Sequence, residues 1–183
     1  MLREITLLLP AVLALTTPHA SASASEAPPS LEPLIKVIRE RLDLAESVAR
    51  FKLHHKLPVT DRGREDTVIA NAKREGEPPL EREEIRELFV AQIEANKLAQ
   101  YALLARWQSL GVTPKAPGDI SAVRSQLDQL QTRLLQTYAD FAPHRRDPDC
   151  IRWVTRARDK QTLNPIQDMA LIRAVGELCV VNK

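Results

Sequence analysis

Apolar residues recur along most of the chain with the three- and four-residue spacing of amphipathic helices. In residues 31–56 this repeat consists of Leu34, Ile38, Leu42, Ala45, Val48 and Ala49. The same periodicity, bounded by glycine, proline and capping residues, predicts further helices over residues 62–75, 81–110, 122–141, 149–160 and 165–180. No segment has the alternating pattern of a β-strand. We therefore predict an all-α fold, a single-domain helical bundle of about six helices.

Two cations interrupt the apolar face of the first helix. Arg41 and Lys52 are eleven residues apart, so their directions differ by only about 20° and their positions by about 16 Å along the axis. Lysine and arginine are almost never fully buried without a partner. An anion, from the protein or from a ligand, is therefore expected beside them. The alternative is that both lie at the edge of the apolar face and extend into solvent.

Polar residues also stand beside the apolar faces of other helices. They are Asp61, Arg64 and Glu65 at the start of 62–75, Gln92, Asn96 and Gln100 in 81–110, and Arg133 in 122–141. If these faces meet, the bundle interior holds several cations together with amides and carboxylates. Each group also has a simpler interpretation, as an exposed polar face, as a surface ion pair or, for Asp61, as a helix cap.

The composition excludes several classes of function. The chain has 26 basic and 24 acidic residues, intermixed, with a net charge of +2, which does not predict the one-sided basic surface of a nucleic-acid-binding protein. No spacing indicates an activated nucleophile, a metal cluster or a glycine-rich phosphate loop. Cations and amides suit a small dianion that carries a hydroxyl group. Chemistry there would come from orientation and electrostatic stabilisation.

The N-terminal residues have the pattern of a secretory signal peptide. Arg3 precedes an apolar run over residues 5–15, and small residues within 20–24 fit an A-x-A cleavage site. The run is shorter than the roughly 20 residues that span a bilayer, although a retained anchor is the alternative. We expect a periplasmic or secreted protein that has no membrane contact after cleavage. The predicted division is a signal peptide over 1–22, a disordered lead-in over 23–30 and the helical domain over 31–183.

Cys150 and Cys179 are the only two cysteines. Because exported compartments are oxidising, we predict a disulfide between them rather than two buried thiols. A loop of about 30 residues closed in this way stabilises the fold by about 3–4 kcal/mol in the chain-entropy model.

The polar positions together resemble those of a known enzyme family. The series consists of Arg41, Lys52, Asp61, Arg64, Glu65, Asn96 and Gln100. In identity and spacing it is similar to the all-α chorismate mutases of the AroQ type. The signal peptide, Arg133 and the late cysteine pair resemble the secreted gamma subclass, in which one chain supplies the whole site. The resemblance covers about residues 31–179.

The resemblance implies a role for each of these residues in the rearrangement of chorismate to prephenate. Arg41 and Arg133 would hold the two substrate carboxylates, while Lys52 and Gln100 would stabilise the ether oxygen from opposite sides. The remaining substrate-binding residues would be Asp61 and Arg64, which shape the pocket, Glu65, which receives the ring hydroxyl, and Asn96, which lies near a carboxylate. The family implies a homodimer and requires no cofactor or metal.

Two other functions are compatible with the same sequence. An isochorismate pyruvate lyase would share the fold, although such enzymes resemble the shorter intracellular form. A non-catalytic exported helical adaptor or effector would share only the bundle.

Overall fold

The computed structural model describes residues 25–180, which form seven α-helices and one short 3₁₀ turn. The helices are α1 (Leu31–Asp43), α2 (Ala45–His54), α3 (Arg62–Glu75), α4 (Arg82–Ser109), α5 (Ile120–Phe141), α6 (Cys150–Asp159) and α7 (Pro165–Val175), with η1 (Ala142–His144) after α5. Every predicted helical segment contains a helix, and the first is divided in two. The prediction of an all-α bundle is confirmed.

Local capping signals set several helix boundaries. The Asp61 side chain accepts from the Arg64 backbone nitrogen at 3.1 Å and so caps the start of α3. Gly76 follows the last residue of this helix. At α7, Asn164 accepts from two backbone nitrogens of the first turn. These side chains satisfy the donors that a helix start leaves unpaired, and the predicted start of each of these helices was correct.

The first predicted helix is interrupted at Leu44, between α1 and α2. In the turn before this interruption, the Asn96 side chain of α4 donates to the Arg41 carbonyl at 3.5 Å. The helix also ends at His54, two residues earlier than expected. Arg41 and Lys52 therefore lie on two successive helices rather than on one.

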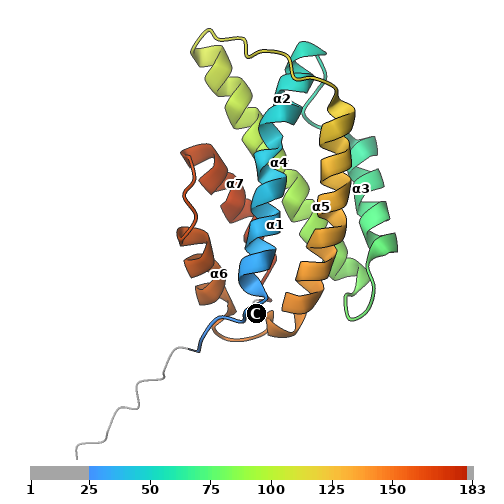
Figure 1. The fold of residues 1–183 in the computed structure, drawn as a ribbon, viewed down its shortest axis with the longest axis vertical. Coiled ribbons are helices and arrows are strands. Elements are labelled where there is room, and N and C mark those ends of the chain that lie inside the picture. Colours follow the sequence, from blue (N-terminus) through green and yellow to red (C-terminus); the bar gives the residue numbers. More distant parts are fainter. Residues whose placement is uncertain (1–24, 181–183) are drawn as a thin grey trace, which may run out of the picture.

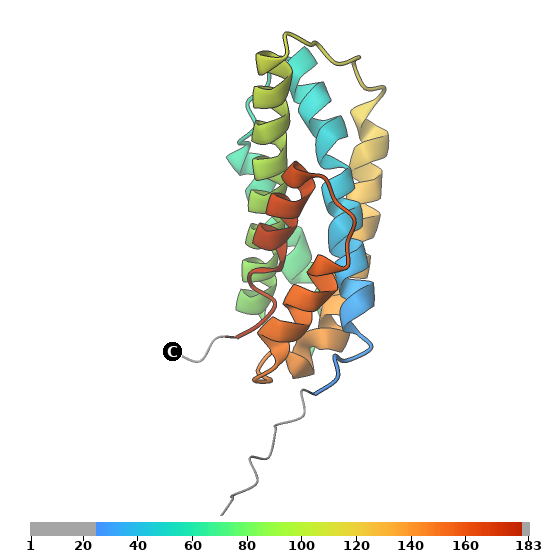
Figure 2. The ribbon, with the colours of Figure 1, turned by 90° about the vertical axis from the view of Figure 1, so that its left-hand side faces the viewer.

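The helices form two groups around α1, α2 and α4. In Figure 1, α3 and α5 lie on one side of these central helices, and α6 and α7 lie on the other. Figure 2 shows α6 and α7 from their own side, lying over α1 and the middle of α4. The two sides have different roles, because the hydrophobic core extends toward α6 and α7 while polar residues gather toward α3.

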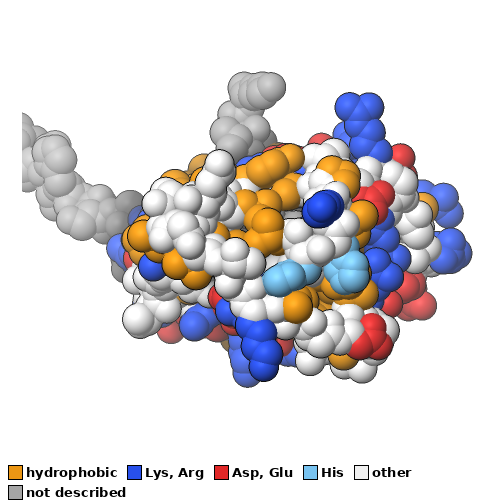
Figure 3. Space-filling view, turned by 90° about the horizontal axis from the view of Figure 1, so that it is seen from above, with side chains coloured by type: hydrophobic (Ala, Val, Ile, Leu, Met, Phe, Trp, Pro, Cys, Tyr) orange, Lys and Arg blue, Asp and Glu red, His pale blue; other side chains and the backbone are white. Residues whose placement is uncertain are grey.

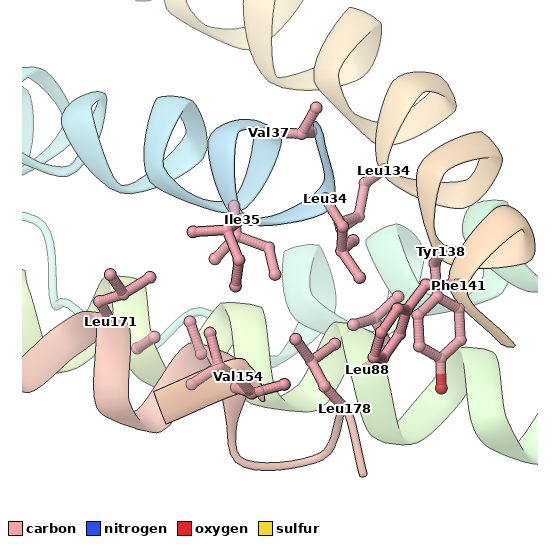
Figure 4. Close-up of a cluster of buried hydrophobic side chains, with 14 of the residues drawn as sticks. Leu34, Ile35, Val37, Leu88, Leu134, Tyr138, Phe141, Val154, Leu171 and Leu178 are labelled. Atoms are coloured by element: carbon pink, nitrogen blue, oxygen red, sulfur yellow. The ribbon is translucent and has the colours of Figure 1, made fainter. Parts of the chain in front are cut away.

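The core joins α1, α4, α5 and the C-terminal helices. Figure 4 shows side chains from these elements in mutual contact, among them Leu34, Leu88, Leu134, Phe141 and Leu178. All five are fully buried. Burying a leucine or phenylalanine side chain contributes about 1.5–3 kcal/mol, so this cluster holds the central helices in a fixed arrangement.

A disulfide fixes the C-terminal helices. Cys150 at the start of α6 and Cys179 after α7 are joined, with a Cα–Cα distance of 5.8 Å. The predicted pairing is confirmed. Between these residues, α7 packs extensively against α4, so the bond secures a helix that supports the central one.

Residues 25–30 differ from the predicted disordered lead-in, because Pro28 is buried and Ser25 is hydrogen-bonded to the start of α6. The predicted signal peptide over 1–22 lies outside the described residues. Among the residues that the structure describes, no helix has the length and apolar character needed to cross a membrane.

The end of the bundle where α2 and α4 finish carries exposed apolar side chains. Figure 3 looks onto this end and shows histidine side chains beside hydrophobic ones. His54 Nε2 lies 2.7 Å from the Pro114 carbonyl oxygen. This contact ties the loop between α4 and α5 to the end of α2.

Candidate functional site

A cavity of about 450 Å³ opens between the α1–α2 segment and helices α3, α4 and α5. Its wall includes every residue that was predicted to bind the substrate, with the exception of Arg133. The structure thus brings together side chains from four parts of the chain. They are Arg41, Lys52, Asp61, Arg64, Glu65, Asn96 and Gln100.

Arg41 is the most deeply buried cation of the cavity, with 9% of its surface exposed. Its Nη1 donates to the Leu127 carbonyl at 3.1 Å, and its guanidinium lies 5.6 Å from the centre of the Phe89 ring. Its Nε is buried without a hydrogen-bond partner. Burial lowers the pKa of Arg41 to about 10, and Asp128 partly opposes this shift. The side chain stays charged at neutral pH and is held ready for an anion.

Lys52 lies on α2, the helix after the one that carries Arg41, and also lines the cavity. Its side chain is half-buried. Its Nζ donates to the Val59 carbonyl at 2.5 Å. Burial lowers the pKa of Lys52, whereas the carboxylates of Asp61 and Glu65 favour its charged form. The ammonium has three donors, so it retains N–H groups for a ligand in the cavity.

Amide side chains of α4 form the wall beside these cations. Gln100 is buried, and its Nε2 donates to Asn96 Oδ1 at 2.6 Å. Gln92 donates to the Ala174 carbonyl of α7 at 2.8 Å. An amide nitrogen has two N–H groups, so Gln100 keeps one donor beyond its bond to Asn96. Gln92, Asn96 and Gln100, the polar residues predicted beside the apolar face of this helix, all line the cavity.

The start of α3 brings opposite charges to the rim. Glu65 accepts from the Asp61 backbone nitrogen at 3.0 Å, and Lys97 lies 3.4 Å from its other oxygen. Arg64 Nη2 lies 3.7 Å from the carboxylate of Asp128 on α5. These contacts hold Glu65 in place and leave Arg64 only weakly paired.

The structure corrects the placement of Arg133. This residue is outside the cavity and pairs with Glu40 at 2.7 Å, with 49% of its side chain exposed. Arg133 follows Gln131 by two residues, about 200° around the helix, and therefore points away from the face of α5 that Gln131 occupies. The expectation that Arg133 lies in the bundle interior was wrong.

Arg124 is the arginine of α5 that lines the cavity, and it was not predicted from the sequence. It precedes Gln131 by seven residues, which brings the two within about 20° of each other. Arg124, Asp128 and Gln131 follow the spacing of one helical stripe, and all three line the cavity. That stripe was the signal that could have identified Arg124.

The arrangement is suited to binding an anion. Arg41, Lys52, Arg64 and Arg124 bring four cations to one cavity. In the described part of the chain, no three histidine, cysteine or acidic side chains gather in a way that could hold a metal ion. Fixed charges and amide donors in a partly buried cavity can orient a dianion and stabilise negative charge that develops within it.

Known proteins are similar to this chain in sequence and in the arrangement of the helices. Residues 32–101 match the family model described as chorismate mutase type II. The chain is 34% identical to the chorismate mutase of Burkholderia phymatum, whose crystal structure superposes with a TM-score of 0.77 over 83% of this chain and 97% of that one. The chain belongs to the chorismate mutase family. The resemblance and the fold expected from it are confirmed.

Relatives in this chorismate mutase family also bear on export. The secreted chorismate mutase of Mycobacterium tuberculosis is 28% identical over 182 residues, which are 96% of this chain and 90% of that protein. The secreted chorismate mutase of Yersinia pestis is 36% identical over 105 residues, which are 57% of this chain and 56% of that protein. These names support the periplasmic or secreted location predicted from the N-terminal segment.

Proposed function

We propose that the protein catalyses the rearrangement of chorismate to prephenate in the cavity between α3, α4, α5 and the α1–α2 segment. The observation that carries this proposal is the convergence of Arg41, Lys52 and Gln100 on one cavity in a chorismate mutase fold. The reaction is unimolecular: one C–O bond breaks as one C–C bond forms. Catalysis therefore needs only a fixed substrate conformation and stabilisation of the charge that develops on the ether oxygen.

The cations that line the cavity would hold the substrate carboxylates. Arg41 takes one carboxylate, since its buried guanidinium has a hydrogen-bonding group without a partner. In place of Arg133, we assign Arg64 and Arg124 to the other side of the dianion. A flexible dianion held at both ends spends more of its time in the folded conformation that the reaction requires.

Lys52 and Gln100 would act on the transition state. As the C–O bond breaks, the ether oxygen gains negative charge, and donors aimed at it bind more strongly than they do in the ground state. Lys52 supplies a charged donor from α2, and Gln100 supplies its second amide N–H from α4. A group that stabilises charge present only in the transition state raises kcat rather than lowering KM.

The polar groups around the start of α3 would bind the ring hydroxyl and complete the pocket. Glu65 keeps acceptor capacity although it is held by Lys97 and by the Asp61 backbone. We assign the ring hydroxyl to this carboxylate. Asn96, which contacts Gln100, would fix the direction of that amide.

Incubation of the exported protein with chorismate tests the proposal directly. We expect chorismate to be consumed and prephenate to appear, with activity removed by Arg41→Met and retained by Arg133→Met, an exposed arginine matched to it. Salicylate and pyruvate from isochorismate would instead identify a pyruvate lyase. Chorismate left unchanged at high protein concentration would favour a non-catalytic adaptor or effector and would reject the proposal.

The homodimer implied by the resemblance is part of the proposal. One chain brings Arg41, Lys52, Arg64, Gln100 and Arg124 to the cavity, so the residues assigned to the substrate do not depend on a second copy. A mass measurement of the protein in solution tests it, with a dimer expected and a monomer at micromolar concentration contradicting it.

A further inference from the structure

The first described residue is bound to the start of α6, far away in the sequence. The Ser25 backbone nitrogen donates to Asp149 Oδ2 at 3.1 Å, and its hydroxyl donates to the same oxygen at 2.5 Å. The Ser25 carbonyl oxygen accepts from Trp153 Nε1 at 2.8 Å. All the polar groups of Ser25 are therefore paired with α6 and the residue before it.

The sequence before Ser25 contains two overlapping cleavage patterns. The A-x-A motif at 20–22 would place the cut after Ala22, and the motif at 22–24 would place it after Ala24. The first cut leaves two residues before Ser25, whose nitrogen then remains a neutral amide. The second makes Ser25 the first residue, with a charged α-amino group.

We propose that signal peptidase cuts between Ala24 and Ser25, and that the new α-ammonium group of Ser25 forms an ion pair with Asp149. Water is the co-reactant: the C–N bond breaks, Ala24 leaves with a carboxylate, and the nitrogen of Ser25 takes up protons. This nitrogen is already 3.1 Å from the carboxylate oxygen, a distance at which an ammonium and a carboxylate form an ion pair.

The surroundings of Asp149 suit a second cation. Its carboxylate also lies 2.5 Å from Arg152 Nη2, and 26% of its side chain is exposed. Hydrogen bonds from Ser25 and the charge of Arg152 lower the pKa of Asp149, so the group is anionic at neutral pH. Ser25 and Arg152 both contact Oδ2, and a carboxylate oxygen can accept from more than one donor.

The rest of the N-terminal segment keeps Ser25 in place. Pro28 is buried, and its carbonyl oxygen accepts from the Leu31 backbone nitrogen at 3.1 Å, at the first residue of α1. Asp149 immediately precedes Cys150 of the disulfide. Cleavage at Ser25 would therefore join the start of α1 to the disulfide-linked C-terminal helices by an ion pair that the precursor lacks.

The cleavage site is tested by exporting the full chain from a bacterium and measuring the intact mass and N-terminal sequence of the product. We expect a single chain that begins at Ser25. A product that begins at Ser21 or Ser23, or one that keeps the first 24 residues, overturns the assigned site.

The ion pair is tested by a double-mutant cycle on purified chains with the disulfide intact. Chains that begin at Ser25 or at Ser23 are compared with and without Asp149→Asn, because asparagine keeps an acceptor oxygen and nearly the same shape but carries no charge. We expect Asp149→Asn to raise the unfolding equilibrium constant at least about threefold more in the chain that begins at Ser25. The pKa of the Ser25 amine should also fall toward about 8 in that variant. Equal effects in both chains overturn the ion pair.

Discussion

Replacing Arg41 with methionine should stabilise the protein while it removes activity. Burial lowers the pKa of Arg41 to about 10, well below the usual value for arginine, and a change of one unit in a pKa corresponds to about 1.4 kcal/mol. Keeping this side chain charged in the folded protein therefore costs about 3 kcal/mol. The charge of Arg41 therefore destabilises the folded protein, although it is needed to bind the substrate.

Two contacts of Arg41 offset part of that cost. The hydrogen bond to the Leu127 carbonyl contributes about 1.5 kcal/mol, as is typical for a charged donor, and the contact with the Phe89 ring contributes about 0.5 kcal/mol. Arg41→Met keeps much of the aliphatic packing and loses both contacts. The net expectation is a gain of about 1 kcal/mol in the free energy of unfolding, in line with other replacements of buried charges.

Urea denaturation and steady-state kinetics on the same samples provide the assay. Arg41→Met should raise the unfolding midpoint, by about 2–4 °C if measured thermally, and lower kcat/KM for chorismate by about 100-fold or more. Arg133→Met is the matched control, and its stability should change by less than about 0.5 kcal/mol because its pair with Glu40 is exposed. A folded Arg41→Met protein that is less stable than the parent by 1 kcal/mol or more, on the scale of an ordinary destabilising substitution, would refute the reasoning.

Three other substitutions test the remaining chemistry and the fold. Gln100→Glu should be active only below the pKa of the new carboxyl group, and its kcat/KM should fall about tenfold per pH unit above that pKa. The kcat/KM of the parent should stay constant from about pH 5 to 8. Equal activity of the variant at both ends of that range would contradict the donor role of Gln100. Because burial lowers the pKa of Lys52, the kcat/KM of the parent should decline at alkaline pH before the usual lysine pKa is reached. Lys52→Arg should move this decline to higher pH. A decline at the same pH in the variant would mean that another group titrates. Replacing Cys150 and Cys179 with alanine should lower the free energy of unfolding by about 3–4 kcal/mol, given their separation of 29 residues. Reductant should destabilise the parent and leave the variant unchanged. A loss below about 1 kcal/mol would mean that the C-terminal helices are held by packing without the disulfide.

Helix boundaries were predictable where the signal is local. The start and end of α3 follow from Asp61 and Gly76, residues that act within one turn of themselves. The interruption at Leu44 was not predictable, because it accompanies a hydrogen bond from Asn96, 55 residues away from the carbonyl that it reaches. Such a contact depends on how α4 packs and leaves no mark in the local sequence.

The site was predictable where a polar residue could be placed relative to a known apolar stripe. Arg41 and Lys52 met that condition, and both line the cavity. Arg133 was misplaced because it is adjacent to Leu134, whose face turns toward the hydrophobic core and not toward the cavity. Only packing shows that α5 has two inward faces, one apolar and one that contains Gln131 and Arg124.

One chain supplies every residue to which the proposed mechanism assigns a role, from Arg41 to Arg124. A protein that is secreted beyond the cell envelope is diluted into a volume far larger than the cell that made it. An active site divided between two chains would then lose activity as the dimer dissociates, with a dependence on the square of the concentration. Here the specific activity of each molecule should be independent of dilution, so a single exported chain remains a working catalyst.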